Sequence, residues 1–266
     1  MELDIRNAYD NYELYDKKKL LSILNDLIDN LENGSLRIAE FKDGKIKVNE
    51  WIKLGILLKF KSSNNAIIEG FSDCSWFDKV NLKFKNWNQD MFENSKIRAV
   101  PGCIVREGCY IAKSVTLMPC FVNIGAYIDS GTMIDSWVTV GSCAQIGKNC
   151  HISEGVGIGG VLEPIQANPV IIGDNCFIGA GCKIVEGVII EDNCIIGMGV
   201  NLSASVKIIN RDKGEIVYGR IPTGSVVVPG SIKTKNDINL NAAIIIKKID
   251  NQSLTKTEIN NILREV

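Results

Sequence analysis

Histidine is almost missing from this sequence, and its scarcity narrows the chemistry open to the protein. The 266 residues include nine cysteines but a single histidine, His151. None of the cysteines stands in a C-x-x-C pair, so the ligand spacing of a zinc finger is absent. The odd number of cysteines also argues against a complete disulfide framework. We therefore expect a protein without a bound metal.

A strong net charge and a long apolar stretch are missing as well. The 30 basic and 31 acidic side chains leave a net charge of −1, which gives no reason to expect a nucleic-acid partner. No apolar run approaches the ~20 residues that span a bilayer. The opening MELDIRNAYDNYELYDKKK carries acids where a signal peptide needs a basic and then an apolar segment. We expect a cytoplasmic protein that binds no membrane.

What the sequence does contain is a repeat of six residues. A period of six matches neither a simple strand ladder nor a helix. It predicts a solenoid of short strands with a turn in every hexad, where the aliphatic side chain points inward and glycine relieves the corner. This is the pattern of the left-handed parallel β-helix, a rare exception to right-handed crossovers. The in-phase aliphatic residues are Val122, Ile128, Ile134, Val140, Ile146, Ile152 and Ile158, then Ile172, Ile178, Ile184, Ile190, Ile196, Leu202 and Ile208.

The repeat divides the chain into three parts. We expect a mixed α/β domain over residues 1–98, a β-helix over 99–232 and a C-terminal extension over 233–266. The first part contains a helical segment, KKKLLSILNDLIDNLENG, that ends on Gly34. In the extension AAIIIKKI predicts a strand and LTKTEINNILREV a terminal helix. About six turns at ~4.8 Å each give a prism ~29 Å long.

Two segments break the period, and seven cysteines follow it. Residues 159–169 and 210–220 interrupt the hexads, and loops on a rigid scaffold often carry function. Cys74 and Cys143 lie off the pattern. Each of the other seven stands two residues before an inward aliphatic residue, where a cysteine acts as a small buried hydrophobe rather than as a nucleophile. These seven are Cys103, Cys109, Cys120, Cys150, Cys176, Cys182 and Cys194.

The repeat region also carries a specific family resemblance. The block that begins MPCFVNIGAYIDSGTMIDSWVTVGSCAQIGKNCHISEGVGIGG and continues to NCFIGAG resembles the core of the tetrahydrodipicolinate N-succinyltransferases. The likeness extends through VEGVIIEDNCIIGMGV, GEIVYGRIPTGSVVVPG and AAIIIKKID, and back to RIAEFKDG, GFSDCSWFDKV and IRAVPGCIVREG. It covers nearly the whole chain, with the parts in family order.

The resemblance implies a reaction and an assembly. It implies transfer of succinyl from succinyl-coenzyme A to the amino group of 2-amino-6-oxopimelate, the opened form of tetrahydrodipicolinate, in lysine and diaminopimelate biosynthesis. It also implies a homotrimer of parallel prisms, with active sites in the grooves between neighbouring subunits.

Three residues are candidates for the acceptor side of that site. Arg98, in IRAVPG, matches the family's substrate-binding arginine, and its planar fork suits a carboxylate. The alternative is a capping salt bridge. Asp135, in TMIDSW, matches the family's essential aspartate beside the substrate amine, although an aspartate at a corner can also simply bond turn amides. His151 precedes inward Ile152 and should point outward, where it is a second candidate for the base.

One departure from the family bears on catalysis. Where the family reads A-R-S-E-V-V-E-G, residues 180–187 read AGCKIVEG, so Lys183 takes the place of the usual catalytic glutamate. An ammonium cannot accept a proton unless burial or neighbouring cations lower its pKa. Glu154 or Glu186 are the candidates to compensate. Lys183 itself should point outward, where it could attract the succinyl carboxylate or a phosphate.

Coenzyme A needs backbone partners for its pantetheine arm and basic groups for its phosphates. The run GVGIGG falls inside the hexad pattern and therefore does not predict a dinucleotide-binding turn. The candidates for the arm are the exposed turns at Gly179, Gly197 and Ser203, and those for the phosphates are Lys207, Arg220 and Lys233. Each could equally be solvated surface.

Other functions stay open on the same scaffold. An N-acetyltransferase acting on a related amino acid or an amino sugar is one, and Lys183 keeps it open. A catalytically inactive binding trimer is another. A metal-binding protein like the carbonic anhydrases needs three histidines per site, whereas each chain of a trimer would bring only His151.

Overall fold

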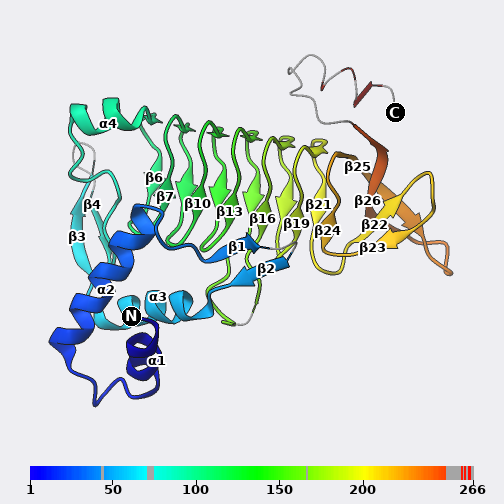
Figure 1. Ribbon diagram of the computed structural model, residues 1–266. Helices are drawn as coiled ribbons and strands as arrows, with labels where there is room; N and C mark the ends of the chain where they lie inside the picture. The colour runs from blue at the N-terminus through cyan, green and yellow to red at the C-terminus, as the bar shows by residue number, and fades with distance from the viewer. Residues whose placement is uncertain are drawn as a thin grey trace.

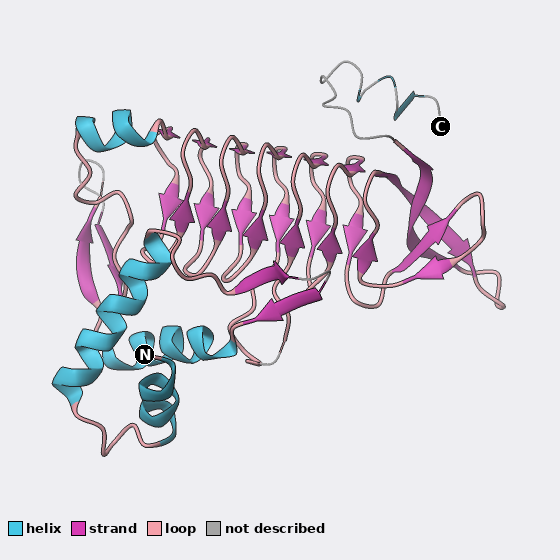
Figure 2. Ribbon diagram, in the orientation of Figure 1, coloured by secondary structure: helices cyan, strands magenta, loops and turns pink. Residues whose placement is uncertain are grey.

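A long triangular prism dominates the computed structural model, with helices beside its N-terminal half and twisted hairpins at its far end (Figure 1). The structure describes residues 1–42, 45–70, 75–165, 167–249, and residues 259, 261, 263 and 264. Helices are confined to the parts of the chain outside the coils (Figure 2).

The N-terminal part combines helices with two hairpins. Helix α2 begins after Asp16, whose side chain accepts hydrogen bonds from the amides of Lys18 and Lys19. It ends at Glu32, and Gly34 follows with φ +79°, the left-handed conformation typical of a helix end. The elements are α1 (Glu2–Asp10), α2 (Lys17–Glu32), β1 (Ala39–Lys42), β2 (Lys45–Val48), α3 (Glu50–Ser62), β3 (Ala66–Glu69), β4 (Ser75–Asp78) and α4 (Gln89–Ser95).

Three sheets of parallel, mostly two-residue strands form the prism, as the hexads predict. We name the faces after one outward residue each. The histidine face holds β5 (Arg98–Ala99), β8 (Thr116–Leu117), β11 (Met133–Ile134), β14 (His151–Ile152), β17 (Phe177–Ile178) and β20 (Ile195–Ile196). The lysine face holds β6 (Ile104–Val105), β9 (Phe121–Val122), β12 (Thr139–Val140), β15 (Gly157–Ile158), β18 (Lys183–Ile184) and β21 (Asn201–Leu202). The tyrosine face holds β7 (Tyr110–Ile111), β10 (Tyr127–Ile128), β13 (Gln145–Ile146), β16 (Ile171–Ile172), β19 (Ile189–Ile190) and β24 (Arg220–Ile221).

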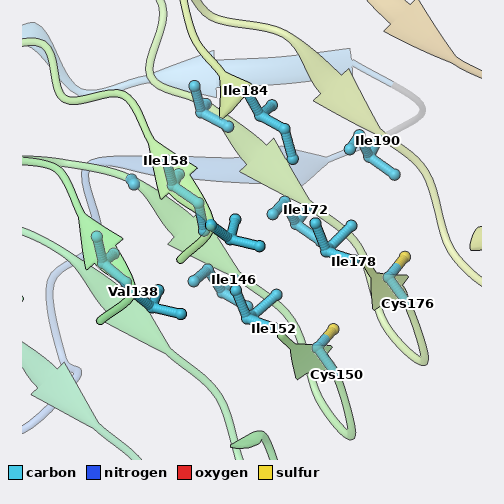
Figure 3. Packing of buried hydrophobic residues seen from close by; sticks show 14 of the residues in the cluster. Val138, Ile146, Cys150, Ile152, Ile158, Ile172, Cys176, Ile178, Ile184 and Ile190 are labelled. Carbon is cyan, nitrogen blue, oxygen red and sulfur yellow. The ribbon is translucent and has the colours of Figure 1, made fainter. Parts of the chain in front are cut away.

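The second residue of each coil strand fills the interior of the prism. Ile146, Ile152 and Ile158 come from three different faces, and all point into the same core (Figure 3). Each is at most 2% exposed. The two six-stranded sheets also agree with the expected six turns.

Ile208 is the exception among the fourteen in-phase residues. The chain leaves the prism after Leu202, and β24 takes the next place on the tyrosine face through the pair Ile190–Ile221. Ile208 lies instead in β22 (Lys207–Asn210), which pairs with β26 (Asn239–Lys248) and helps to close the end of the prism. It is still fully buried. The six-residue spacing of aliphatic residues continues to Ile208 in the sequence, but the backbone has already left the coils.

Both interruptions leave the prism at the lysine–tyrosine edge, where each coil turns from the lysine face to the tyrosine face. Residues 159–170 connect β15 to β16 and pack against the N-terminal part. Fully buried Lys53 of α3 donates from Nζ to the carbonyl oxygens of Ile165, at 3.1 Å, and Ala167. Burial lowers the pKa of Lys53. Residues 203–219 carry β22 and its antiparallel partner β23 (Ile216–Val217).

The C-terminal part continues from the last coil. Strand β25 (Ser225–Lys233) pairs with β20 and antiparallel with β26, which confirms the strand predicted at AAIIIKKI. The helix predicted in LTKTEINNILREV lies outside the described residues except for 259, 261, 263 and 264, which are helical. The divisions at residues 98 and 232 stay predictions.

The cysteines on the repeat are buried, with Cys103 only partly so. Cys150, Cys176 and Cys194 occupy equivalent interior corners of successive coils, and two of them are seen in Figure 3. Their Sγ atoms lie 3.0, 3.1 and 3.2 Å from carbonyl oxygens of the following coil. The thiols therefore act as weak donors at the corner as well as filling space. Cys143, off the pattern, is also fully buried, in contact with the N-terminal core.

Candidate active site

A column of outward side chains on the histidine face joins two of the predicted site residues. Arg98 pairs with Thr116, Thr116 with Met133, and Met133 with His151. First residues of coil strands point outward, so Arg98 and His151 lie on the same face, three strand spacings apart, or about 14 Å. Arg98 is exposed and His151 partly exposed.

Asp135 stands beside His151, at the edge where coils turn from the histidine face to the lysine face. Its amide donates to the carbonyl oxygen of Ile152 at 2.9 Å, and its Oδ1 accepts from the amide of Ser136 at 2.7 Å. Its Oδ2 lies 3.9 Å from Nε2 of His151, and both side chains are 27% exposed. That distance is too long for a hydrogen bond but short enough for charge interaction when the imidazole is protonated.

The imidazole of His151 is oriented by an aromatic neighbour that the sequence analysis missed. Phe177, the next residue in the column, stacks on it with ring centroids 5.5 Å apart and planes at 17°. Phe177 in turn packs against a small core that includes Ile195, Val226 and Ile259. The hexad register would have revealed Phe177, because it occupies the same position in the next coil as His151.

Beyond Asp135, the corner residues of the histidine–lysine edge are glycines. Gly155, Gly181 and Gly199 occupy equivalent corners of successive coils with φ of +66°, +70° and +74°, and a Cβ added to any of them would meet nothing within 4 Å. The predicted residues Glu154, Gly179 and Gly197 lie in the same three turns. The expectation that Gly179 and Gly197 are exposed is wrong: both are buried, because their amides donate to the carbonyl oxygens of Ile196 at 2.7 Å and Val227 at 2.8 Å in the next coil. The Glu154 side chain is exposed. The glycine corners thus leave the backbone of this edge open, beside the exposed side chains of Glu154 and Met198.

Lys183 approaches this edge from the lysine face. Its side chain is exposed, and its Nζ donates to the carbonyl oxygen of Gly155 at 2.9 Å. It reaches there by lying across Gly157, where an added Cβ would be 2.9 Å from Cδ of Lys183. Gly157, a residue that the sequence analysis did not single out, leaves the path open.

The other predicted residues lie elsewhere. Arg220 is on the tyrosine face, where its guanidinium contacts Oε1 of Glu191 at 2.5 Å. Lys233 pairs with Asp237 at 3.0 Å. At the lysine–tyrosine edge, Glu186 accepts a hydrogen bond from the amide of Ala204 at 3.1 Å. Ser203 follows β21 at that same edge, and Lys207 begins β22. The structure therefore places seven of the predicted residues along the histidine face and its edge with the lysine face, over about five strand spacings: Arg98, Asp135, His151, Glu154, Gly179, Lys183 and Gly197. Ser203 and Arg220 lie at other places on the prism, and Lys207 and Lys233 lie in the strands at its end.

Two further features are absent from the described ranges. No group of three or more His, Cys, Asp or Glu side chains there could hold a metal ion. None of the helices described is long and apolar enough to cross a membrane.

Known proteins match this chain along nearly its full length. Residues 1–61 match the model of the tetrahydrodipicolinate N-succinyltransferase N-terminal domain. Residues 125–160 match the bacterial transferase hexapeptide of six repeats, and residues 169–204 the hexapeptide repeat of succinyl-transferase. A 2,3,4,5-tetrahydropyridine-2,6-dicarboxylate N-succinyltransferase of Wolbachia pipientis wMel is 51% identical over 267 residues, covering 98% of this chain and 97% of the relative. The chain belongs to the tetrahydrodipicolinate N-succinyltransferase family.

Further family members and a solved structure agree. The Acinetobacter baylyi relative of the same name is 54% identical over 240 residues, covering 90% of this chain and 88% of its own. A solved structure from Campylobacter jejuni, named as a 2,3,4,5-tetrahydropyridine-2-carboxylate N-succinyltransferase, has a TM-score of 0.54 and 16% identity, covering 84% of this chain and 62% of that one. At that identity it supports the fold alone. The left-handed β-helix predicted from the hexads is thereby confirmed.

Proposed function

We propose that this family member transfers the succinyl group of succinyl-coenzyme A to the amino group of 2-amino-6-oxopimelate, a cytoplasmic step of lysine and diaminopimelate biosynthesis. The observation that carries the proposal is the 51% identity to a named succinyltransferase over 98% of the chain. Succinyl-coenzyme A is here a substrate, the acyl donor, and we expect no metal.

The reaction sets three requirements. The neutral amine attacks the thioester carbonyl carbon, so that a C–N bond forms and the C–S bond breaks. The amine loses a proton to a base, and the departing thiolate gains one. Developing charge on the carbonyl oxygen needs hydrogen-bond donors, and the dicarboxylic acceptor needs cations.

We assign the base to Asp135. Its carboxylate is accessible at the edge, and one oxygen is fixed by the Ser136 amide, which leaves Oδ2 directed toward His151. A carboxylate held in this way can accept the amine's proton without moving. His151 stands next to it as the alternative base, and Glu154, one coil further along the edge, is a second carboxylate. Arg98 is our candidate for an acceptor carboxylate, because its exposed guanidinium lies on the same face.

The donor has a route along the same edge. Backbone groups at the exposed corners Gly181 and Gly199 can pair with the amides of a pantetheine arm, whereas the amides of buried Gly179 and Gly197 already donate to the next coil. Ser203 remains a candidate for the arm, and Lys207 and Lys233, near the end of the prism, remain candidates for the phosphates, as does Arg220. Arg220 would first have to release Glu191.

We further propose a homotrimer whose sites lie in grooves between subunits. Trp137 and Met198, both on the histidine–lysine edge, are 73% and 72% exposed. Large apolar side chains left in water beside a candidate site suit a surface that another subunit covers. Light scattering at micromolar concentration should give three times the chain mass, and a monomer would contradict the assembly.

A thiol-release assay tests the function. With 2-aminopimelate as acceptor, succinyl-coenzyme A should be turned over and acetyl-coenzyme A much less. Asp135→Asn should lower kcat by ~10²-fold or more, the scale of a lost general base. Asp129→Asn is a matched control, since Asp129 caps the amide of Ser130 at 2.7 Å in the same way on another edge. Equal activity of the two variants would refute the role of Asp135, and equal use of both donors would favour an N-acetyltransferase.

A further inference from the structure

Lys183 lies at the site, but neither proton transfer nor acceptor binding gives it a role. An ammonium has three N–H donors and no acceptor, so it cannot replace a glutamate as base. Yet the side chain is held in one place: Nζ donates to the Gly155 carbonyl oxygen at 2.9 Å, over a path that Gly157 keeps clear. A cation fixed at this edge can bind an anionic group of a ligand.

The position of that cation relative to Asp135 follows from the hydrogen bonds between coils. The amide of Gly155 donates to the carbonyl oxygen of Ser136 at 3.0 Å, and the amide of Ser136 donates to Oδ1 of Asp135 at 2.7 Å. Gly155 thus lies one coil above the residue that follows Asp135. Although the backbone of Lys183 is two coils away, its Nζ reaches back to the neighbouring coil. The ammonium and the carboxylate are therefore separated along the axis by about one strand spacing, ~4.8 Å.

The surroundings of Nζ leave room for a ligand. Among the residues that the structure describes, Gly155 accepts from one of the three N–H groups, so two remain for an incoming oxygen pair. Gly155 and Gly181, on either side, have open space where a Cβ would stand. The hydrogen bond to Gly155 already restrains the side chain, which lies across Gly157, and this reduces the conformational freedom that binding would remove.

We propose that Lys183 binds the free carboxylate of the acyl donor and so selects succinyl over neutral acyl groups. The inference rests on the proposed function. In succinyl-coenzyme A two methylene groups separate this carboxylate from the thioester carbonyl, a span comparable to one strand spacing of about 4.8 Å. With its carboxylate on Lys183, the donor presents its carbonyl carbon toward Asp135, where the acceptor amine attacks that carbon, expels the coenzyme A thiolate and gives its proton to the Asp135 carboxylate.

The test compares two donors of equal chain length. Butyryl-coenzyme A has a methyl group where succinyl-coenzyme A has the carboxylate, and the coenzyme is identical. In the full-length enzyme, Lys183→Met should lower kcat/KM for succinyl-coenzyme A by about tenfold to a hundredfold, the range of a charge-assisted hydrogen bond, and weaken its Kd in a competition assay. The Kd for butyryl-coenzyme A should stay the same. Lys148→Met, an exposed lysine on another edge, should change neither.

Gly157→Ala provides a second perturbation that keeps the charge. Its Cβ would displace the lysine stem from its path, so it should reduce the preference for succinyl in the same direction but less. An equal loss for both donors in Lys183→Met would place the lysine on the coenzyme's phosphates and overturn the proposal, as would an unchanged ratio. If the wild-type enzyme fails to turn over succinyl-coenzyme A at all, the proposed function itself is wrong, so the two failures are distinguishable.

Discussion

Thiol reactivity offers a direct measurement of how tightly the prism is closed. Burial raises the pKa of Cys120 and of Cys143 to about 12, from an ordinary value of 9.0. Since only the thiolate reacts, the reactive fraction at pH 8 falls from about one tenth to about one ten-thousandth, a ~10³-fold loss before any effect of access. Cys103 is only partly buried, and its pKa is raised less. We expect it to be the fastest of the three.

The assay follows release of a coloured thiol from an aromatic disulfide reagent, with and without urea. A Cys74→Ser background removes the cysteine that lies outside the described residues. In native protein we expect one fast phase, which Cys103→Ser abolishes, and then reaction at the rate of unfolding. In urea all remaining thiols should react together. If Cys120 or Cys143 reacted in the native protein within tenfold of Cys103, the closed interior would be refuted.

Three further predictions concern single residues. Arg98→Lys should raise the acceptor KM by about tenfold with little change in coenzyme A affinity, because lysine cannot bind a carboxylate bidentately; equal weakening of both ligands would make Arg98 structural. Cys176→Val should retain activity, because Val115 fills the equivalent corner in an earlier coil, and lost turnover in a folded variant would contradict this. Burial lowers the pKa of Lys53 in the fold, so the unfolded chain holds more protons up to about pH 10.5 and stability rises with pH in that window. In urea unfolding at pH 8 and pH 10, the free energy of unfolding of the wild type should therefore rise relative to that of Lys53→Met. Equal changes in the two proteins would contradict the prediction.

The interior of the prism was predictable because one physical rule decides each position. In a two-residue strand the second side chain points inward, and the sequence repeats an aliphatic residue there with little variation. Ile208 shows the limit of this reasoning. Its spacing continues the series, but whether the chain stays in the coil depends on pairing with Ala243 of β26, 35 residues later, which a local period does not report.

The site was predictable in part, for a related reason. A residue beside an inward position must point outward, which places Asp135, His151 and Lys183 on the surface. Which edge each one occupies depends on counting turns across the two interruptions. Counting the turns places Arg220 on a different face from the others. Amino-acid composition alone could not have predicted this. Gly157 and Phe177 escaped notice because their importance lies in what they touch, one coil away, rather than in their own chemistry.

The stacking of coils also fixes the distances between residues along the histidine face. Arg98 begins β5 and Asp135 follows β11, two strands further along the same face, so their backbones are held about 10 Å apart along the axis. A seven-carbon diacid that binds Arg98 through a carboxylate and presents its amine to Asp135 must have a length that matches this spacing. The distance between Arg98 and Asp135 can change only by whole coils. Adding or removing part of a coil would turn interior side chains outward. Selectivity for acceptor length in such a protein therefore changes in steps of ~4.8 Å, and no gradual adjustment of the backbone lies between them.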